Sequence, residues 1–256
     1  MPDLEKELRS RRDQGRKLLI PYLMGGMTDD WGQCLAAVVA AGADAVEVGI
    51  PFSDPMIDGP VIQEAGLRAL KRHTVPDDVL DGIARAEAPV PIAVMTYYNI
   101  VYRAGHKRMA SSLAAAGVTG AILPDLSLEE LAPWATEADA AGVDTVLLVA
   151  PSSPEDRVAR ICARARGFVY AVARMGVTGE RQDVGSQAAK VVERVRRHTD
   201  LPVCVGVGVS TPEHAAEVCE VADGVVVGSA LVRRLIEGEG PEGAAAFVGS
   251  LREAID

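Results

Sequence analysis

Short apolar runs alternate with longer helical patterns along the whole chain, and this alternation limits the fold more than any other feature of the sequence. Eight runs rich in Val, Ile and Leu have the length of strands, and a segment with helical periodicity follows each of them. Continuous apolar runs are typical of parallel strands that are covered on both faces. Eight such units in 256 residues predict a closed barrel. An open doubly wound sheet fits less well, because it usually has fewer strands and a glycine-rich turn after the first.

The predicted elements divide the chain as follows. The strands occupy residues 17–24, 45–50, 91–97, 120–123, 144–150, 168–173, 202–207 and 224–227. The helices occupy residues 4–12, 29–41, 60–71, 76–86, 106–116, 128–141, 186–198, 212–221, 230–237 and 243–254, and one more follows the fifth strand. The side chains expected to cap or open helices are Thr28 or Asp29, Ser127, and Ser152 or Ser153. We therefore expect a single domain over residues 1–256, a (β/α)8 TIM barrel of the α/β class. An extra N-terminal helix should cover its lower face, and a short helix should follow strand eight.

Composition and charge exclude several classes of function. The formal net charge of −10 argues against a nucleic-acid surface, which would need a basic stripe. No apolar run approaches 18 residues and the N-terminus has no apolar signal core, so we expect a cytoplasmic protein without membrane contact. The four cysteines form no CxxC pair, and no HExxH motif is present. We therefore expect no disulfide and no metal site.

Glycine-rich loops follow the last three strands, at the end of the barrel where active sites of this fold lie. They include Gly176 to Gly179 with Thr178 between them, Gly206 to Ser210, and Gly228-Ser229 directly before the short helix. Glycines let backbone N–H groups approach an anion, and a helix N-terminus adds a favourable dipole. Each glycine taken singly is better explained by a tight turn. Together the three loops predict a phosphate-binding cradle.

The stretch VEVGIPFSDPMIDGP, residues 46–60, places acidic residues at the end of the second strand. Glu47 lies inside an apolar strand, and an ionised carboxylate removed from water raises its pKa. Such a group is suited to general acid–base catalysis near neutral pH. A structural glutamate paired with Arg or Lys across the barrel is the alternative. In the proline-stiffened loop that follows, Asp54 and Asp58 are near-equal candidates for a second catalytic carboxylate. Either could instead form an Asx turn or cap the next helix.

This stretch resembles the strand-two signature of the tryptophan synthase alpha subunit family. The segments ILPDL (122–126), RMGVTG (174–179), GVGVSTPE (206–213) and GVVVGSALV (224–232) are similar to later landmarks of that family. The resemblance spans nearly the whole chain. It implies cleavage of indole-3-glycerol phosphate into indole and glyceraldehyde 3-phosphate, with Glu47 and Asp58 at the catalytic positions. It also implies that Asp54 is a loop or interface residue and not the second catalytic carboxylate.

The resemblance assigns further residues to the substrate. Tyr170 matches a tyrosine that lines the family's pocket, and Tyr22 and Tyr97, near the ends of strands one and three, could pack on the indole. The residues that match phosphate-contacting positions are Gly179, Val207, Gly208, Gly228 and Ser229.

The resemblance also implies a partner. An alpha subunit pairs with a beta subunit, usually as α2β2, and pyridoxal phosphate is expected only in that beta subunit and not in this chain. The loops at 51–60 and 176–187 would form the contact and the lid. Atypical residues in the loops, such as Ile57, keep open a stand-alone indole-3-glycerol-phosphate lyase. A non-catalytic binding subunit and another phosphate-binding barrel, such as a sugar-phosphate isomerase, are further alternatives.

Overall fold

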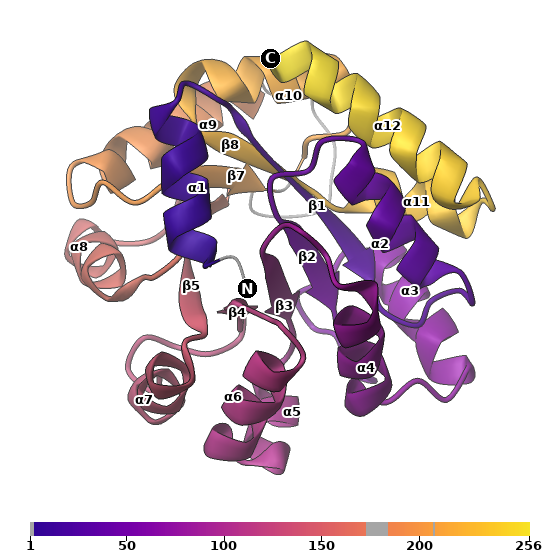
Figure 1. Ribbon diagram of the computed structural model, residues 1–256. Helices are drawn as coiled ribbons and strands as arrows, with labels where there is room; N and C mark the ends of the chain where they lie inside the picture. Colours follow the sequence, from indigo (N-terminus) through magenta and orange to yellow (C-terminus); the bar gives the residue numbers. More distant parts are fainter. Residues whose placement is uncertain (1–2, 173–183, 207) are drawn as a thin grey trace.

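The computed structural model describes residues 3–172, 184–206 and 208–256 of the chain. Within these residues eight parallel strands close into a barrel in sequence order, with helices around the outside (Figure 1). The last strand pairs with the first, so the sheet has no free edge. The strands are β1 Leu18–Met24, β2 Val46–Gly49, β3 Ile92–Met95, β4 Gly120–Ile122, β5 Asp144–Val149, β6 Val169–Val172, β7 Val203–Gly206 and β8 Gly224–Val227. The predicted TIM barrel is confirmed, and each strand falls within its predicted range.

The helices that surround the barrel agree with most of the predicted ranges. In the described part of the chain they are α1 Leu4–Asp13, α2 Trp31–Ala40, α3 Pro60–Lys71, α4 Pro76–Ala86, α5 Tyr98–Ala104, α6 His106–Ala115, α7 Ala132–Ala141, α8 Glu155–Arg164, α9 Val184–Arg196, α10 Pro212–Val221, α11 Ser229–Ile236 and α12 Gly240–Ile255. The N-terminal helix and the short helix after strand eight are both present as α1 and α11.

Helix α5 is absent from the sequence prediction, which left residues 98–104 as a connection. Its N-cap residue, Tyr97, makes no capping hydrogen bond with its own side chain. The carboxylate of Asp125 instead accepts a hydrogen bond from the N–H of Tyr98, at 2.9 and 3.1 Å from its two oxygens. Because this cap comes from a distant part of the sequence, no local pattern indicates where α5 begins.

Helix α7 begins four residues later than predicted, and its predicted cap, Ser127, is wrong. Pro133 lies in the first turn of α7, where its missing N–H and fixed φ are tolerated. A helix that began at residue 128 would carry this proline in its interior. The Ser127 hydroxyl contacts Glu130 instead.

The predicted caps of two other helices are also wrong. Helix α2 follows Asp30, whose side chain makes no capping hydrogen bond, and not Thr28 or Asp29. Helix α8 follows Pro154, and the hydroxyl of Ser153 accepts a hydrogen bond from the N–H of Ala150 instead of capping the helix. Short polar side chains before a helix serve turns as well as caps, so their presence alone does not fix its first residue.

Helix α1 closes one end of the barrel, as the sequence predicts, and crosses it in the view of Figure 1. Leu4 and Leu8 are fully buried in the cluster that fills the barrel interior together with Phe168. A Cβ built on Gly120 would lie 2.5 Å from Leu4 Cδ2, and one on Gly167 would lie 2.8 Å from it. These glycines therefore leave the space that Leu4 fills, and α1 acts as an apolar plug.

The N-terminus of α10 offers a direct test of a local cap. The hydroxyl of Thr211 accepts a hydrogen bond from the N–H of His214 at 3.3 Å. Thr211→Ala should lower the free energy of unfolding by about 1 kcal/mol in urea denaturation. Asp30→Ala at α2, where the side chain makes no capping bond, is the matched control and should cost clearly less. Equal losses for the two variants would contradict the assignment of the cap.

Candidate active site

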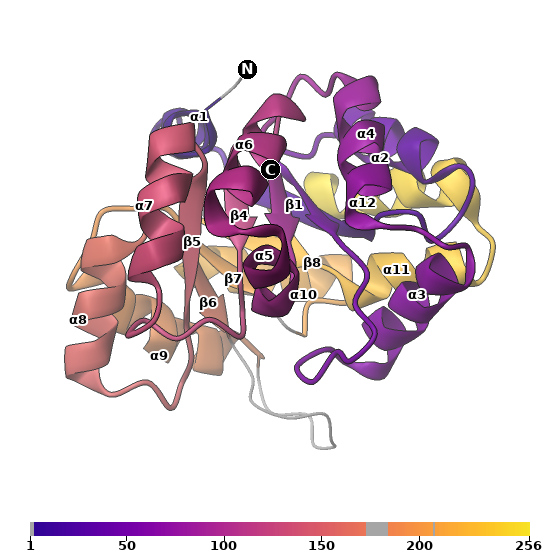
Figure 2. The same cartoon turned by 90° about the horizontal axis from the view of Figure 1, so that it is seen from below.

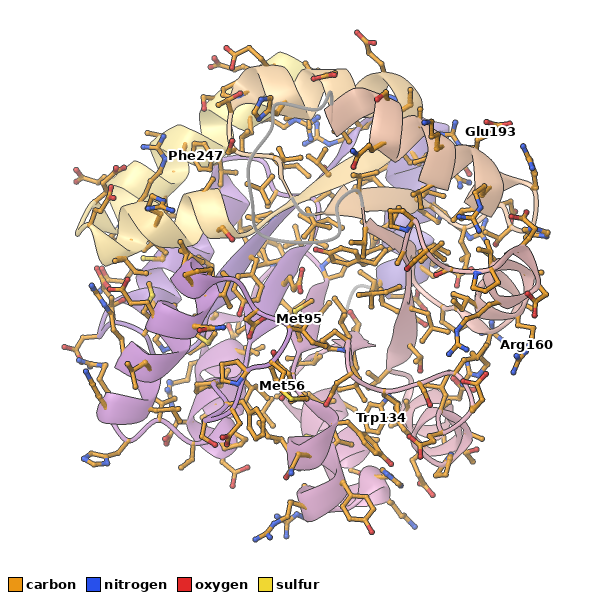
Figure 3. The ribbon with its side chains drawn as sticks, turned by 180° about the vertical axis from the view of Figure 1, so that it is seen from behind. Met56, Met95, Trp134, Arg160, Glu193 and Phe247 are labelled. Atoms are coloured by element: carbon orange, nitrogen blue, oxygen red, sulfur yellow. The ribbon has the colours of Figure 1, made fainter. Side chains whose placement is uncertain are left out.

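The candidate site lies at the C-terminal ends of the strands, on the side of the barrel away from α1. The loop between β2 and α3 extends on this side (Figure 2). Figure 3 views the same end and shows Met95 of β3 near the centre of the barrel. In the strand register Tyr22 pairs with Glu47, and Glu47 pairs with Ala93. Since paired residues of parallel strands project to the same side, Tyr22 and Glu47 both face the barrel interior.

The carboxyl group of Glu47 is buried and has no hydrogen-bond partner among the described residues. The exposed fraction of Glu47 is 1%, and both carboxyl oxygens lack a partner among these residues. Burial raises the pKa of the Glu47 carboxyl to about 8, and the nearby charge of Asp58 adds to this shift. The alternative of a structural ion pair with Arg or Lys finds no support among these residues. At neutral pH the group is therefore a carboxylic acid that can donate a proton.

Asp58 occupies the end of the loop that connects β2 to α3. It is half-buried and does not cap α3, because Gly59 is the N-cap residue and makes no side-chain bond. Burial raises the pKa of the Asp58 carboxyl, and a hydrogen bond from the Tyr97 hydroxyl partly opposes this rise. Asp54 is exposed and accepts a hydrogen bond from the Ser53 hydroxyl at 2.5 Å. The geometry therefore separates two aspartates that the sequence pattern left equal.

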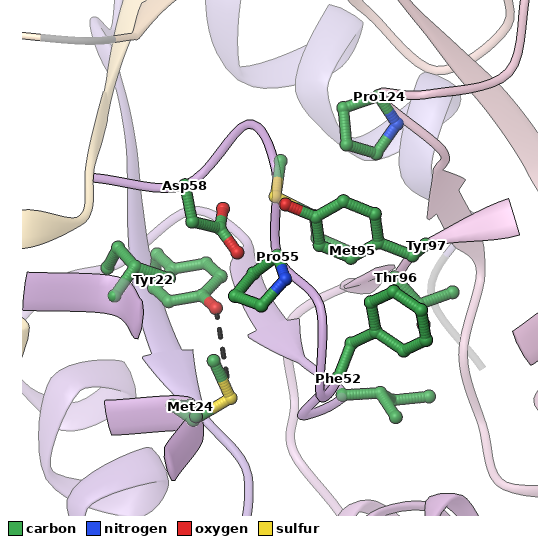
Figure 4. Close-up of a pocket in the computed structure, with 12 residues that line it drawn as sticks. Tyr22, Met24, Phe52, Pro55, Asp58, Met95, Thr96, Tyr97 and Pro124 are labelled. Carbon is green, nitrogen blue, oxygen red and sulfur yellow. Dashed lines mark hydrogen bonds between the residues drawn. The ribbon is translucent and has the colours of Figure 1, made fainter. Parts of the chain in front are cut away.

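One pocket brings Asp58 together with Tyr22 and Tyr97 (Figure 4). Glu47 and Tyr170 do not line it. Tyr22 connects Glu47 to the pocket, because it lines the pocket with Asp58 and is the register partner of Glu47 on the neighbouring strand. Burial and then the charges of Asp58 and Glu47 raise the pKa of Tyr22. Further lining residues, which the sequence analysis did not single out, include Met24, Phe52, Pro55, Met95, Thr96 and Pro124. Most of them follow strand ends, and that position is the one signal that could have indicated them.

Tyr170 and Tyr22 each fill space beside a glycine of the neighbouring strand. A Cβ on Gly206 would lie 2.1 Å from the hydroxyl oxygen of Tyr170, and one on Gly49 would lie 2.0 Å from that of Tyr22. Burial raises the pKa of Tyr170 well above its ordinary value, with a further contribution from the charge of Glu47. The two tyrosines thus both lie near Glu47 and keep water away from it.

Only part of the predicted phosphate-binding cradle lies within the described residues. Gly228 is the N-cap residue of α11, which begins at Ser229 with no side-chain cap, so its first N–H groups are available to an anion. A Cβ on Gly228 would lie 3.7 Å from that of Tyr22, which puts this helix end beside the pocket. Gly208 is exposed after β7 and has a φ of 107°, which favours glycine. Thr178, Gly179 and Val207 lie outside the described residues.

Two further features bear on the kind of site. No group of three or more His, Cys, Asp or Glu side chains among the described residues is placed to hold a metal ion. In the same part of the chain, no helix has the length and apolar character that a membrane crossing requires.

A closed (β/α)8 barrel with a buried carboxyl group and a second carboxyl group near the C-terminal ends of its strands has the architecture of a barrel enzyme. Residues 8–252 match the family model described as tryptophan synthase alpha chain. The chain is 46% identical to the tryptophan synthase alpha chain of Thermobifida fusca over 93% of its own length and 90% of that protein. The chain belongs to the tryptophan synthase alpha chain family, whose members are subunits of a tryptophan-biosynthetic enzyme.

Solved structures agree with this assignment. A structure of Mycobacterium tuberculosis tryptophan synthase superimposes with a TM-score of 0.91 at 40% identity, covering 98% of this chain and 97% of that one. The tryptophan synthase subunit alpha of Legionella pneumophila gives a TM-score of 0.90 at 32% identity, covering 100% of this chain and 99% of that one. The barrel therefore has the fold of this family.

Proposed function

We propose that this chain is a carbon–carbon lyase that cleaves indole-3-glycerol phosphate to indole and glyceraldehyde 3-phosphate. The observation that carries this proposal is the uncompensated, buried Glu47 carboxyl with Asp58 near it at the barrel mouth. The bond to be broken joins indole C3 to a carbon that bears a hydroxyl group. The reaction needs a proton donor at C3 and a base for the hydroxyl, and one carboxyl group can serve as both in turn.

In the proposed mechanism Glu47 begins as a carboxylic acid and donates its proton to C3, which leaves a cationic indolenine. Asp58 accepts a hydrogen bond from the ring N–H and stabilises this cation. The Glu47 carboxylate then takes the proton of the side-chain hydroxyl. As the aldehyde forms, the electrons of the C3–carbon bond return to the ring and release neutral indole. Glu47 ends protonated, as it began, and the cycle needs no cofactor in this chain.

The pocket would hold the indole end of this substrate, and the loops beside it would hold the phosphate. Tyr22, Tyr97, Phe52 and Met95 provide apolar and aromatic surface for an indole ring. For the phosphate we propose the start of α11 at Gly228 and Ser229, together with Gly208 and the sequence-predicted Thr178, Gly179 and Val207. Tyr170 would shield Glu47 from water.

We further propose that the chain works with a tryptophan synthase beta subunit, as α2β2, and that only the beta subunit carries pyridoxal phosphate. The side chains of Met56 and Ile57, in the loop that ends at Asp58, are 85% and 55% exposed. Exposed apolar side chains of this kind mark interaction surfaces. A cytoplasmic location fits the four cysteines, which are all free and buried.

The test is an assay of indole release from indole-3-glycerol phosphate by the purified chain, alone and with a beta subunit. Release that rises strongly with the beta subunit supports the proposal. A fast rate that does not change when the beta subunit is added would favour the stand-alone lyase. The relatives reported above are named as tryptophan synthase chains. No release under either condition, with turnover of a sugar phosphate instead, would contradict the proposal.

The pH dependence of the reaction follows from Glu47. Its pKa of about 8 lies above the ordinary value of 4.5, so the acid form persists at neutral pH. Because the first step needs that proton, kcat/KM for indole release should fall as pH rises through about 8 in the free enzyme. A profile that stays level across this range, with its only change near pH 4.5, would show that the protonated acid is not required.

A further inference from the structure

We propose that Tyr97 is a positioning residue, which acts through its hydroxyl to hold Asp58 and the loop at 52–58 in the geometry that catalysis needs. The inference rests on the proposed function and deepens it. The sequence indicated Tyr97 only as a surface for the indole ring. The contacts of its hydroxyl and of its ring indicate this second role.

The loop is held around the Tyr97 side chain at two points. Near its start, the ring of Phe52 stacks on the ring of Tyr97, with centroids 5.0 Å apart and planes 26° apart. Near its end, the N–H of Ile57 donates a hydrogen bond to the Tyr97 hydroxyl oxygen at 3.1 Å. Tyr97 is 6% exposed, so a buried side chain anchors a loop whose intervening Met56 is open to solvent.

The Tyr97 hydroxyl also reaches the reactive end of the loop. It lines the same pocket as Asp58 and helps to keep the pKa of that carboxyl from rising further. Because the hydroxyl oxygen accepts from Ile57, its one proton remains to be donated, and Asp58 is the acceptor that the proposal assigns to it. In this arrangement Tyr97 acts on the substrate through Asp58.

Other contacts fix the backbone of the loop and not the carboxylate. The side-chain amide of Gln63 in α3 donates to the carbonyl oxygens of Asp58, at 2.8 Å, and of Pro55, at 3.4 Å. Without the Tyr97 hydroxyl these bonds would keep the loop near the barrel. The Ile57 N–H would lose its acceptor, and the Asp58 carboxyl would lose the influence that favours its ionised form. Loss of the hydroxyl should therefore impair Asp58 more than it impairs the fold.

Three titratable side chains from three elements face Asp58 among the described residues. They are Tyr22 on β1, Glu47 on β2 and Tyr97 at the start of α5. The hydrogen bond from Tyr97 favours the ionised form of Asp58, so its removal should raise the pKa of that carboxyl further.

The test compares Tyr97→Phe with Tyr98→Phe in the otherwise intact chain. Tyr98 is the matched control, because its hydroxyl bonds to Nε2 of His106 at 2.9 Å and it does not line the pocket. Tyr97→Phe should lower kcat for indole release on the order of 10- to 100-fold with a smaller change in KM, whereas Tyr98→Phe should leave both near wild type. The acid limb of the pH profile should move to higher pH in Tyr97→Phe alone. In an Asp58→Asn background, Tyr97→Phe should have little further effect.

Two outcomes would overturn the inference. One is wild-type kinetics in Tyr97→Phe, and the other is a loss that adds fully to that of Asp58→Asn with no movement of the acid limb. An NMR titration of the Asp58 carboxyl provides a readout independent of turnover. If the wild-type chain releases no indole, the proposed function fails, and this titration still decides the positioning role: a higher midpoint in Tyr97→Phe supports it and an unchanged midpoint refutes it.

Discussion

Glu47→Gln should reduce the rate of indole release by roughly 10²- to 10⁴-fold, the usual contribution of a positioned general acid–base group. Glutamine matches glutamate in size but has no proton to donate to C3 and cannot take one from the hydroxyl. Glu47 is the buried side chain whose two oxygens lack partners among the described residues, so the substitution breaks no ion pair or hydrogen bond within them. The measurement is indole release at neutral pH over a range of indole-3-glycerol phosphate concentrations. KM for this substrate should stay near the wild-type value.

The stability of the same variant provides the control. In the folded protein the pKa of Glu47 is raised from 4.5 to about 8, so wild-type stability should decline as pH rises through this interval. Glutamine resembles the neutral acid, and the variant should lose less stability over the same interval. A folded Glu47→Gln protein that keeps wild-type turnover would show that the catalytic assignment is wrong.

Asp44→Ala should have the largest effect on stability, lowering the free energy of unfolding by about 3–5 kcal/mol. Asp44 is fully buried at the end of the barrel away from the site. Its Oδ1 lies 2.8 Å from Arg11 and 2.7 Å from Arg16, and its Oδ2 lies 2.9 Å from Arg252. Oδ2 also accepts the N–H of Leu19 at 2.9 Å. One carboxylate thus joins α1, the start of β1 and α12.

The expected cost comes from the groups that remain after the substitution. Three guanidinium groups would be left around an empty position, and a buried N–H would lose its acceptor. Asp200→Ala is the matched control, because both carboxylate oxygens of Asp200 also accept hydrogen bonds from an arginine. Each lies 3.0 Å from Arg9, but the Asp200 side chain is 86% exposed. It should cost no more than about 1 kcal/mol in urea denaturation. Similar losses for the two variants would contradict the importance of burial.

The barrel could be predicted because its signal is local and repeated. Each strand is a short, mainly apolar run with turn residues on either side. One example is β8, which has the sequence GVVV. The wrong bounds at α5 and α7 arise where a distant residue caps a helix or where a proline restricts its first turn. Asp125 caps α5 from another loop, and Pro133 moves the start of α7. Neither effect is visible in the periodicity of the segment that it changes.

The site was predictable where one residue violates the pattern around it. A glutamate inside an apolar strand indicated Glu47 directly, whereas Asp54 and Asp58 could not be separated without the family resemblance. Contacts across the barrel could not be predicted from the sequence, because they depend on how strands and loops meet in space. The stacking of Phe52 on Tyr97 and the space that Gly49 leaves for Tyr22 are two such contacts.

The central claim is that the barrel delivers Glu47 to the site as a neutral acid at neutral pH. The most direct measurement is an NMR titration of ¹³C-labelled glutamate carboxyl groups in the folded chain, with Glu47→Gln used to assign the resonance. We predict a midpoint near pH 8 for Glu47. A midpoint near the ordinary value of 4.5 would mean that Glu47 is ionised at neutral pH and would contradict the proposed first proton transfer.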